Sequence, residues 1–339
     1  MQKEAALNKM WNDFPHIKED LLRCRKFILD FIDIPNEEVK NCVLELVNSD
    51  AKLIRPALMI ITGKMLNDGK DLDDDFIAMA ATLEMLHIAT LIHDDVVDDS
   101  PLRRGVATLQ SRYGKDVATY AGDYMLSSVF SNVLDYSKTM ENAKIITSSV
   151  NKILSGELIQ MQNRNNFCVS EGDYYKIIHG KTAVMIALCC YEGAYMTGKY
   201  DMSKKLWDMG ESIGMAFQII DDILDYSDEK TIKKPPFQDF REGNFTLPIL
   251  YSMKNYIKEL KKIKEDINIE EDKGLDFQEI EENKKQLKKI VEISGGIDYS
   301  RKKAREYTNI ALSILDGYEK SEYREYLHQL IKKLLDRSY

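Results

Sequence analysis

Two aspartate-rich segments of the sequence place carboxylates at positions i, i+1 and i+4. The first holds Asp94, Asp95 and Asp98, and the second holds Asp221, Asp222 and Asp225. On a helix, residues i and i+4 lie on one face, one turn apart. Crowded carboxylates repel one another unless a cation neutralises them. Hard oxygen ligands suit Mg²⁺, which a few carboxylates and substrate phosphates usually hold. The spacing therefore predicts a Mg²⁺ site.

The surroundings of the two segments decide between a metal site and an ordinary charged helix turn. Asp99 follows the first segment and repeats the one-turn spacing with Asp95, on a second face of the helix. Both segments have apolar flanks, such as Ile219 and Ile223 around the second. Carboxylates among apolar residues are hard to explain as solvated surface. A single such motif is better explained as a charged turn, but two of them favour function.

Basic residues accompany both segments. Arginine forks and lysine ammonium groups are what diphosphate recognition needs, although each residue alone is more often a solvated surface charge. The basic residues before and after the first segment are Lys52, Arg55, Arg103 and Arg104. Those before and after the second segment are Lys181, which is followed by Thr182, and then Lys233 and Lys234.

The elements that must position these residues are predicted to be helices. No proline falls between Leu102 and Lys234, and apolar residues recur there at intervals of three and four. The segment Ala183 to Cys190 is apolar all round, which is typical of a central helix in a bundle. The acidic segment Glu265 to Asp276 is predicted to be a surface connection. We therefore expect an all-α chain, with residues 1–339 forming a single domain of long antiparallel helices.

Composition excludes several classes of protein. A formal net charge of −9 argues against a nucleic-acid partner, which would demand a basic face. The five cysteines form no CxxC pair, so a disulfide framework and a structural zinc site are not expected. No run of 18 apolar residues and no secretory layout at the N-terminus is present, so we expect a cytoplasmic protein with at most peripheral membrane contact.

Several motifs together resemble the trans-isoprenyl diphosphate synthase family, particularly its bacterial long-chain polyprenyl branch. The resemblance covers most of the chain. Besides both aspartate motifs, the matching residues are Lys52 to Pro56, His87, Arg103-Arg104-Gly105, Gly122-Asp123 at the expected start of the next helix, Lys181-Thr182, Gln218, Lys234-Pro235, Thr246-Leu247-Pro248, Gly295-Gly296-Ile297 and Ala304 to Tyr307.

The resemblance implies a fold and a mechanism. The implied fold is the isoprenoid synthase bundle around a central cavity. Mg²⁺ ions would bridge the two aspartate clusters to an allylic diphosphate, with Arg103, Lys181 and Lys234 adding positive charge. Isopentenyl diphosphate would be held by Lys52, Arg55, His87 and Arg104, while Thr182 and Gln218 support the cation or phosphate. His93, beside the first cluster, is predicted to have a packing or supporting role.

Three segments differ from the family pattern. Asp50-Ala51-Lys52-Leu53 stands where the family has a GGKR element, so both glycines and one arginine are absent. Ala107 replaces a proline after the first motif. The family's GKPxGxD element reads Lys233-Lys234-Pro235-Pro236-Phe237-Gln238-Asp239, so Lys233 and Phe237 replace its two glycines, and Asn244 stands where many members have lysine.

Product length is predicted from the residues one turn before Asp94. These are Ala89 and Thr90, where short-chain members carry aromatic residues that block the tail. At about 1.5 Å of helix per residue, these residues lie beneath the site. Because alanine and threonine are small, they leave room for the growing tail, which predicts a polyprenyl diphosphate of about six to ten units. Met125 and Phe130 are candidates for the floor of the tunnel. The alternative role of Ala89 is close helix packing.

Rival functions remain at this point. They are a short-chain farnesyl or geranylgeranyl diphosphate synthase, a class I terpene cyclase, a regulatory subunit, and a helical binding protein without chemistry. A cyclase would usually show one DDxxD and an NSE-type motif, and a regulatory subunit typically loses its aspartates. The resemblance also implies a dimer, with apolar helices between Gly122 and Leu154 at its interface. We expect a homodimer, with a heteromer containing a small non-catalytic subunit as the alternative.

Overall fold

A computed structural model describes residues 7–49, 52–226, 237–273 and 277–335. The chain divides into two compact units. Unit 1 comprises residues 1–148, 188–207 and 319–327, and unit 2 comprises residues 149–187, 208–318 and 328–339. Each unit is described by itself.

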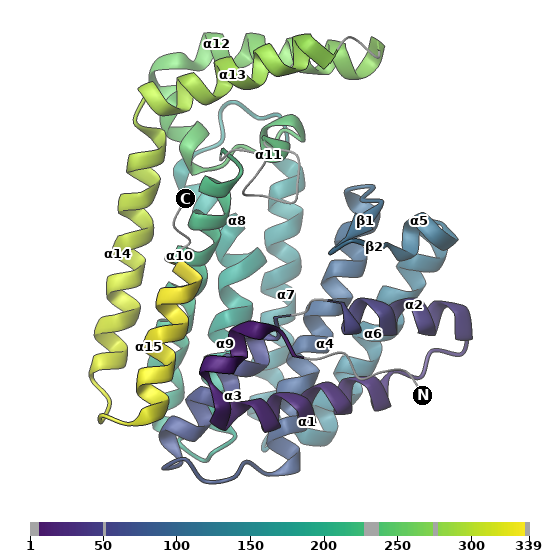
Figure 1. Cartoon of the computed structure of the whole chain (residues 1–339), viewed down its shortest axis with the longest axis vertical. Helices are drawn as coiled ribbons and strands as arrows, with labels where there is room; N and C mark the ends of the chain where they lie inside the picture. Colours follow the sequence, from purple (N-terminus) through teal and green to yellow (C-terminus); the bar gives the residue numbers. More distant parts are fainter. Residues whose placement is uncertain (1–6, 50–51, 227–236, 274–276, 336–339) are drawn as a thin grey trace. The chain divides into compact units, whose positions relative to one another are not determined.

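Helices make up nearly all of the described chain, which confirms the all-α prediction (Figure 1). The only strands among the described residues are β1 (Leu102–Arg103) and β2 (Val106–Ala107). The helices are η1 (Lys9–Asp13), α1 (Pro15–Phe31), α2 (Glu37–Asn48), α3 (Ile54–Leu66), α4 (Asp74–Val97), α5 (Leu109–Tyr113), α6 (Lys115–Tyr136), α7 (Met140–Gln162), α8 (Glu171–Ile178), η2 (His179–Ala183), α9 (Val184–Tyr195), α10 (Tyr200–Leu224), α11 (Gln238–Arg241), α12 (Leu247–Lys273), α13 (Phe277–Ile293), α14 (Gly296–Asp316) and α15 (Glu322–Leu335).

The core of unit 1 is built on α4, which packs along α6 and also against α1 and α3. The Asp73 side chain caps α4 by accepting a hydrogen bond from the Phe76 backbone at 2.8 Å, and Asp74 and Asp75 lie in its first turn. Nearly every side chain from Phe76 to Ile92 is buried, as expected for a helix that is apolar all round. By length and composition alone α4 could span a membrane, but 78% of its apolar window is buried inside the protein.

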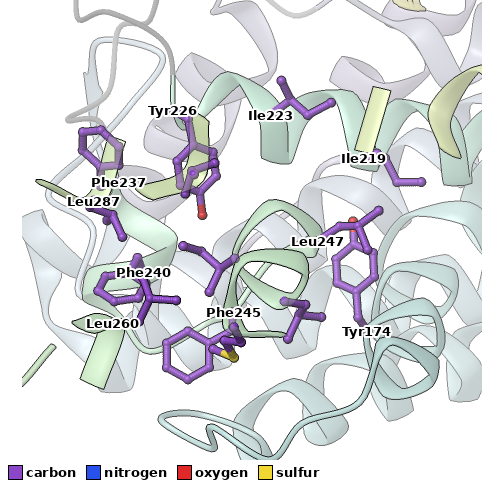
Figure 2. Close-up of a cluster of buried hydrophobic side chains, with 14 of the residues drawn as sticks. Tyr174, Ile219, Ile223, Tyr226, Phe237, Phe240, Phe245, Leu247, Leu260 and Leu287 are labelled. Carbon is purple, nitrogen blue, oxygen red and sulfur yellow. The ribbon is translucent and has the colours of Figure 1, made fainter. Parts of the chain in front are cut away.

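Unit 2 has its own apolar core, which includes Tyr174, Ile219, Ile223 and Leu247 (Figure 2). These side chains come from α8, α10 and α12, and α12 also packs along α13 and α14. The segment Glu265 to Asp276 was predicted to be a connection, and this prediction is wrong for its first part. Helix α12 continues to Lys273, because Ile263 and Ile267 are buried on the same face.

The predicted central helix is confirmed, and the N-terminal region also contributes to the core. Trp11 and Phe14 are fully buried, and the indole of Trp11 donates to the backbone oxygen of Lys52 at 2.7 Å. Cys189 and Cys190 on α9 are buried thiols, as expected for core positions. The predicted helix start at Gly122 is wrong, because α6 begins at Lys115 and Gly122 lies well inside it.

Candidate active site

The first aspartate cluster lies at the C-terminal end of α4, in unit 1. The helix ends at Val97, and the Asp98 backbone donates to the Asp94 oxygen at 2.9 Å, which keeps these two residues one turn apart. Asp94 is half-buried, Asp98 is exposed and Asp95 is buried. The predicted second pair of Asp95 and Asp99 is not supported. Asp99 follows the helix end with φ 49° and pairs with Lys115 at 2.5 Å, whereas Asp95 pairs with Arg103.

A tight hairpin brings Arg103 to this cluster. Strands β1 and β2 pair Arg103 with Val106, so only Arg104 and Gly105 form the turn. Both turn residues have positive φ, 52° and 81°, as a type I′ turn requires. The Arg103 Nε donates to Asp95 Oδ1 at 2.7 Å, a charge-assisted bond. The Arg-Arg-Gly run therefore supplies both the turn geometry and the cation beside Asp95.

His93 connects the first cluster to α6. Its Nε2 lies 3.0 Å from Asp123 Oδ1. A Cβ atom built on Gly122 would meet the same imidazole at 2.5 Å. The Gly-Asp pair thus makes room for the ring and binds it, which agrees with a supporting role for His93. The sequence pattern identified Gly122 and Asp123 but not their partner.

The residues expected to bind isopentenyl diphosphate are clustered within unit 1. Burial, together with the charges of Arg55, Arg104 and Arg103, lowers the pKa of His87 well below its usual 6.5, so the imidazole is neutral at pH 7. Burial also lowers the pKa of Arg55, although the nearby Glu84 raises it. Lys52 is exposed, just before α3.

Glu84 is a member of this group that sequence reasoning missed. It is a carboxylic acid within the apolar run of α4, three residues before His87. Burial raises its pKa, and the charges of Arg55 and Arg104 lower it. Its Oε2 atom is buried without a hydrogen-bond partner among the described residues. A lone acid in an apolar helix is the signal that could have identified it.

The second aspartate cluster lies at the C-terminal end of α10, in unit 2. Asp221 is exposed, while Asp222 is buried. The Tyr174 hydroxyl donates to Asp222 Oδ2 at 2.6 Å, and Gln218 Nε2 donates to Oδ1 at 2.8 Å. Burial, with the charge of Asp239 adding to it, raises the pKa of Asp222 to about 8. Tyr174 was not predicted, because it lies far away in the sequence.

Asp225 follows the end of α10 and accepts a hydrogen bond at Oδ1 from the Gln238 backbone at 3.1 Å. Its Oδ2 atom is buried and has no hydrogen-bond partner among the described residues. Burial and the Asp239 charge raise the pKa of Asp225 to about 8. A buried carboxylate oxygen without a partner is costly, and a cation would offset that cost.

Lys181 and Thr182 lie in the π-helical turn η2, also in unit 2. Lys181 Nζ lies 3.2 Å from Glu157 Oε2 and 3.3 Å from Gln160 Oε1, both on α7. Thr182 Oγ1 donates to Gln218 Oε1 at 2.6 Å, so a chain of bonds runs from Thr182 through Gln218 to Asp222. Lys233, Lys234 and Pro235 lie outside the described residues.

The candidate chain-length residues lie on α4 and α6. Ala89 is 1% exposed and Met125 is also buried, while Phe130 is half-buried. The Thr90 hydroxyl donates to the His87 backbone oxygen at 2.8 Å, so its proton is already used within the helix. Ala89 is therefore a small, buried residue about one turn before Asp94.

The donor set fits a hard cation, but neither unit holds a complete cage for one. Within the parts of the chain that the structure describes, no three His, Cys, Asp or Glu side chains converge in a geometry that could hold a metal ion. Mg²⁺ usually takes only one or two protein carboxylates and completes its shell with water and substrate phosphates. Asp94 and Asp98 in unit 1 match that requirement, as do Asp221 and the unpartnered Asp225 oxygen in unit 2.

Comparisons with known proteins identify the family. The family model for polyprenyl synthetase matches residues 36–290. The chain is 35% identical to heptaprenyl diphosphate synthase component 2 of Bacillus subtilis over 243 residues, covering 68% of each chain. It is 33% identical to all-trans-nonaprenyl-diphosphate synthase (geranyl-diphosphate specific) of Rhodobacter capsulatus, covering 95% of this chain and 96% of that protein.

A solved structure confirms the fold assignment. Geranylgeranyl pyrophosphate synthase from Lactobacillus brevis superposes with a TM-score of 0.86 at 32% identity, covering 97% of this chain and 99% of that one. The agreement therefore extends over nearly the whole length of both proteins. With its family match over three quarters of its residues, this chain belongs to the polyprenyl synthetase family.

Proposed function

We propose that this chain is a Mg²⁺-dependent trans-prenyltransferase that condenses isopentenyl diphosphate with an allylic diphosphate. The observation that carries the proposal is the presence of two aspartate clusters, each at a helix end and each with one buried, hydrogen-bonded aspartate beside an exposed or half-exposed one. A terpene cyclase or a non-catalytic subunit has no use for both clusters together with the Arg55, His87 and Arg104 group.

The roles follow from the charges. Asp94, Asp95, Asp98, Asp221, Asp222 and Asp225 would hold Mg²⁺, which neutralises the diphosphate and makes it a leaving group when bound. Lys181, Arg103 and Lys234 add positive charge at the allylic diphosphate. Bonds to Glu157 and Asp95 hold Lys181 and Arg103 in place before substrate arrives. Thr182 and Gln218 orient Asp222.

The second substrate would be bound by Lys52, Arg55, His87 and Arg104. A neutral His87 donates a hydrogen bond without adding repulsion among three arginines, which its lowered pKa favours. Holding both substrates in one site makes the bond-forming step effectively unimolecular. Residues 1–339 are proposed to form a single catalytic domain.

The product is proposed to be a long-chain polyprenyl diphosphate of about six to ten units, as the heptaprenyl and nonaprenyl relatives support. Ala89 and Thr90 would line the start of the tunnel, and Met125 or Phe130 would form its floor. A geranylgeranyl product is the second candidate, because a synthase of that specificity shares 32% identity over nearly the whole chain.

One experiment tests the function and the product together. Purified protein is incubated with Mg²⁺, labelled isopentenyl diphosphate and farnesyl diphosphate, and the products are separated by chromatography. We expect long-chain products with isopentenyl diphosphate in excess. Products that stop at geranylgeranyl length would support prenyltransferase activity but refute the proposed long-chain product. No incorporation of isopentenyl diphosphate with any allylic primer would refute the proposed prenyltransferase activity.

The assembly is proposed to be a homodimer in the cytoplasm. Large apolar side chains are exposed on α6 and α7, including Tyr120, Leu134, Met140 and Leu158, within or next to the segment proposed for the interface. A heteromer with a small non-catalytic subunit is the alternative, which a relative named as component 2 supports. Light scattering on the purified chain distinguishes them. A monomer that is fully active alone would refute both.

A further inference from the structure

The buried aspartate of the second cluster is held from two sides within unit 2. Tyr174 donates to one carboxylate oxygen of Asp222 at 2.6 Å and Gln218 donates to the other at 2.8 Å. Gln218 lies one turn earlier on the same helix, so it can follow any movement of α10. Tyr174 comes from α8, so its bond connects Asp222 to another element of unit 2.

The position of the Tyr174 hydroxyl is fixed by its ring. The side chain is 3% exposed and belongs to the apolar core of unit 2, with Ile219 and Leu247 in the same cluster (Figure 2). Helix α8 is itself fixed at its start, where the Ser170 hydroxyl accepts from the Asp173 backbone at 3.1 Å. A close-packed aromatic ring has few alternative rotamers, so its oxygen is held at one point.

The bond to Tyr174 acts near the C-terminal end of α10. Helix α10 ends at Leu224, two residues after Asp222, and the last turn of a helix frays readily. Asp221 is the neighbouring residue and its carboxylate is exposed. Fixing Asp222 also fixes the backbone of the adjacent Asp221, and with it the direction in which the Asp221 side chain points.

We propose that Tyr174 is a positioning residue of the diphosphate–metal site, which acts through Asp222 to hold Asp221 in its binding orientation. The inference rests on the proposed function, because it assigns Tyr174 to that same site. Partners that orient metal-binding groups typically change metal affinity or activity by about 10-fold to 100-fold when removed. The expected effect of losing the hydroxyl is of that size.

The neighbouring tyrosine supplies a matched control. Tyr175 is half-buried on the same helix, and its hydroxyl donates to Glu171 Oε1 at 2.9 Å, away from the aspartate cluster. Tyr174→Phe and Tyr175→Phe each remove one oxygen atom and keep the ring. Any general effect of deleting a tyrosine hydroxyl from α8 therefore appears in both variants.

The test measures metal binding directly. Mn²⁺, as a stand-in for Mg²⁺, is titrated into each protein with inorganic pyrophosphate present, and binding is followed by electron paramagnetic resonance. We expect Tyr174→Phe to weaken Mn²⁺ binding by roughly 10-fold to 100-fold. Its turnover should recover at high Mg²⁺ concentration, with an unchanged KM for isopentenyl diphosphate. Tyr175→Phe should match the wild type.

Two results would overturn the positioning role. One is Mn²⁺ binding by Tyr174→Phe within about twofold of the wild type, well below the change expected for such a partner. The other is an equal loss in both variants, accompanied by equal falls in melting temperature, which would assign the effect to packing. Failure of the wild-type protein to bind Mn²⁺ with pyrophosphate, or to transfer prenyl groups, would instead refute the proposed function itself.

Discussion

The imidazole of His93 occupies the space that a side chain on Gly122 would need. Nε2 of His93 lies 2.5 Å from the position of a Cβ atom built on that glycine. Gly122 is in the interior of α6, where glycine costs about 1 kcal/mol of helix stability relative to alanine. The close approach to the residue preceding Asp94 explains why glycine is present despite that cost.

Gly122→Ala is therefore expected to displace His93 and to reduce both stability and turnover. Overpacking of this kind costs about 1–3 kcal/mol, which outweighs the gain in helix propensity. Gly172→Ala on α8 is the control, because its Cβ would meet only Ser170 Oγ at 3.5 Å. Urea denaturation measures the effect. The double variant Gly122→Ala with His93→Ala should recover stability, and failure to do so would contradict the steric explanation.

Substitutions of the exposed aspartates should separate chemistry from folding. Asp94→Ala or Asp221→Ala should lower turnover by roughly 100-fold or more, since a few kcal/mol of transition-state stabilisation is lost. The fold should survive, because Asp221 is exposed and Asp94 is half-exposed. Steady-state assays with circular dichroism as the folding control provide the check. Near-normal turnover in both variants, or activity that EDTA leaves unchanged, would contradict the metal mechanism.

The two diphosphate sites should respond to different substitutions. Lys52→Ala and Arg55→Ala should mainly raise the KM for isopentenyl diphosphate. Arg103→Ala should mainly weaken the allylic substrate and also lower kcat, because it leaves the buried Asp95 without its 2.7 Å partner. Removing one charge-assisted hydrogen bond to a substrate corresponds to roughly 10-fold in affinity. A change in the allylic KM alone for Lys52→Ala would reverse the assignment.

Glu192 should make unfolding depend on pH. Burial raises its pKa to about 8 from 4.5, although the Asn142 amide lowers it by donating at 2.7 Å. The folded state then binds one more proton than the unfolded state between these values. Stability therefore falls as pH rises through this window, by up to about 1.4 kcal/mol per pH unit.

Glu192→Gln removes this proton difference, so its free energy of unfolding should decline less than that of the wild type between pH 5 and pH 8, a window set by the same pKa values. Asn142→Leu removes the donor that lowers the pKa, so it should extend the decline to higher pH. Urea denaturation across this range measures both. Parallel profiles for wild type and Glu192→Gln would show that this carboxyl is not neutral in the folded protein.

Product length should depend on the residue one turn before Asp94. Ala89 is fully buried on α4, so Ala89→Tyr should place a ring where the tail is proposed to pass and shorten the products. Phe130→Ala should lengthen them if Phe130 forms the floor. Chromatography of the dephosphorylated products provides the measurement. An unchanged distribution in Ala89→Tyr would assign Ala89 to helix packing alone.

The sequence predicted the helices well and marked where both aspartate clusters lie along the chain, because both features depend on local spacing. Period and proline placement indicated helices such as α10, and the motifs marked Asp94 and Asp221. The helix ends at Val97 and Leu224 were not predicted, since a C-terminal end depends on how the following backbone packs. Tyr174 was missed for a related reason, because its partner Asp222 lies on another element. Glu84 was missed although its place in an apolar helix was a local signal.

The π-helical turn η2 places one residue more between α8 and α9 than a continuous α-helix would hold. The Val184 backbone bonds to the His179 oxygen, a five-residue step that holds one residue more than an α-helical turn. Adjacent residues of this turn bond to different helices, Lys181 to α7 and Thr182 to α10. Loss of a single residue here would therefore convert the turn to an ordinary α-helical one and preserve the phase of α8, so the Tyr174 hydroxyl would stay directed toward Asp222. In alignments, a one-residue gap within 179–183 therefore indicates loss of the π turn, whereas a gap within the α-helical part of α8 would rotate the Tyr174 side chain away from α10.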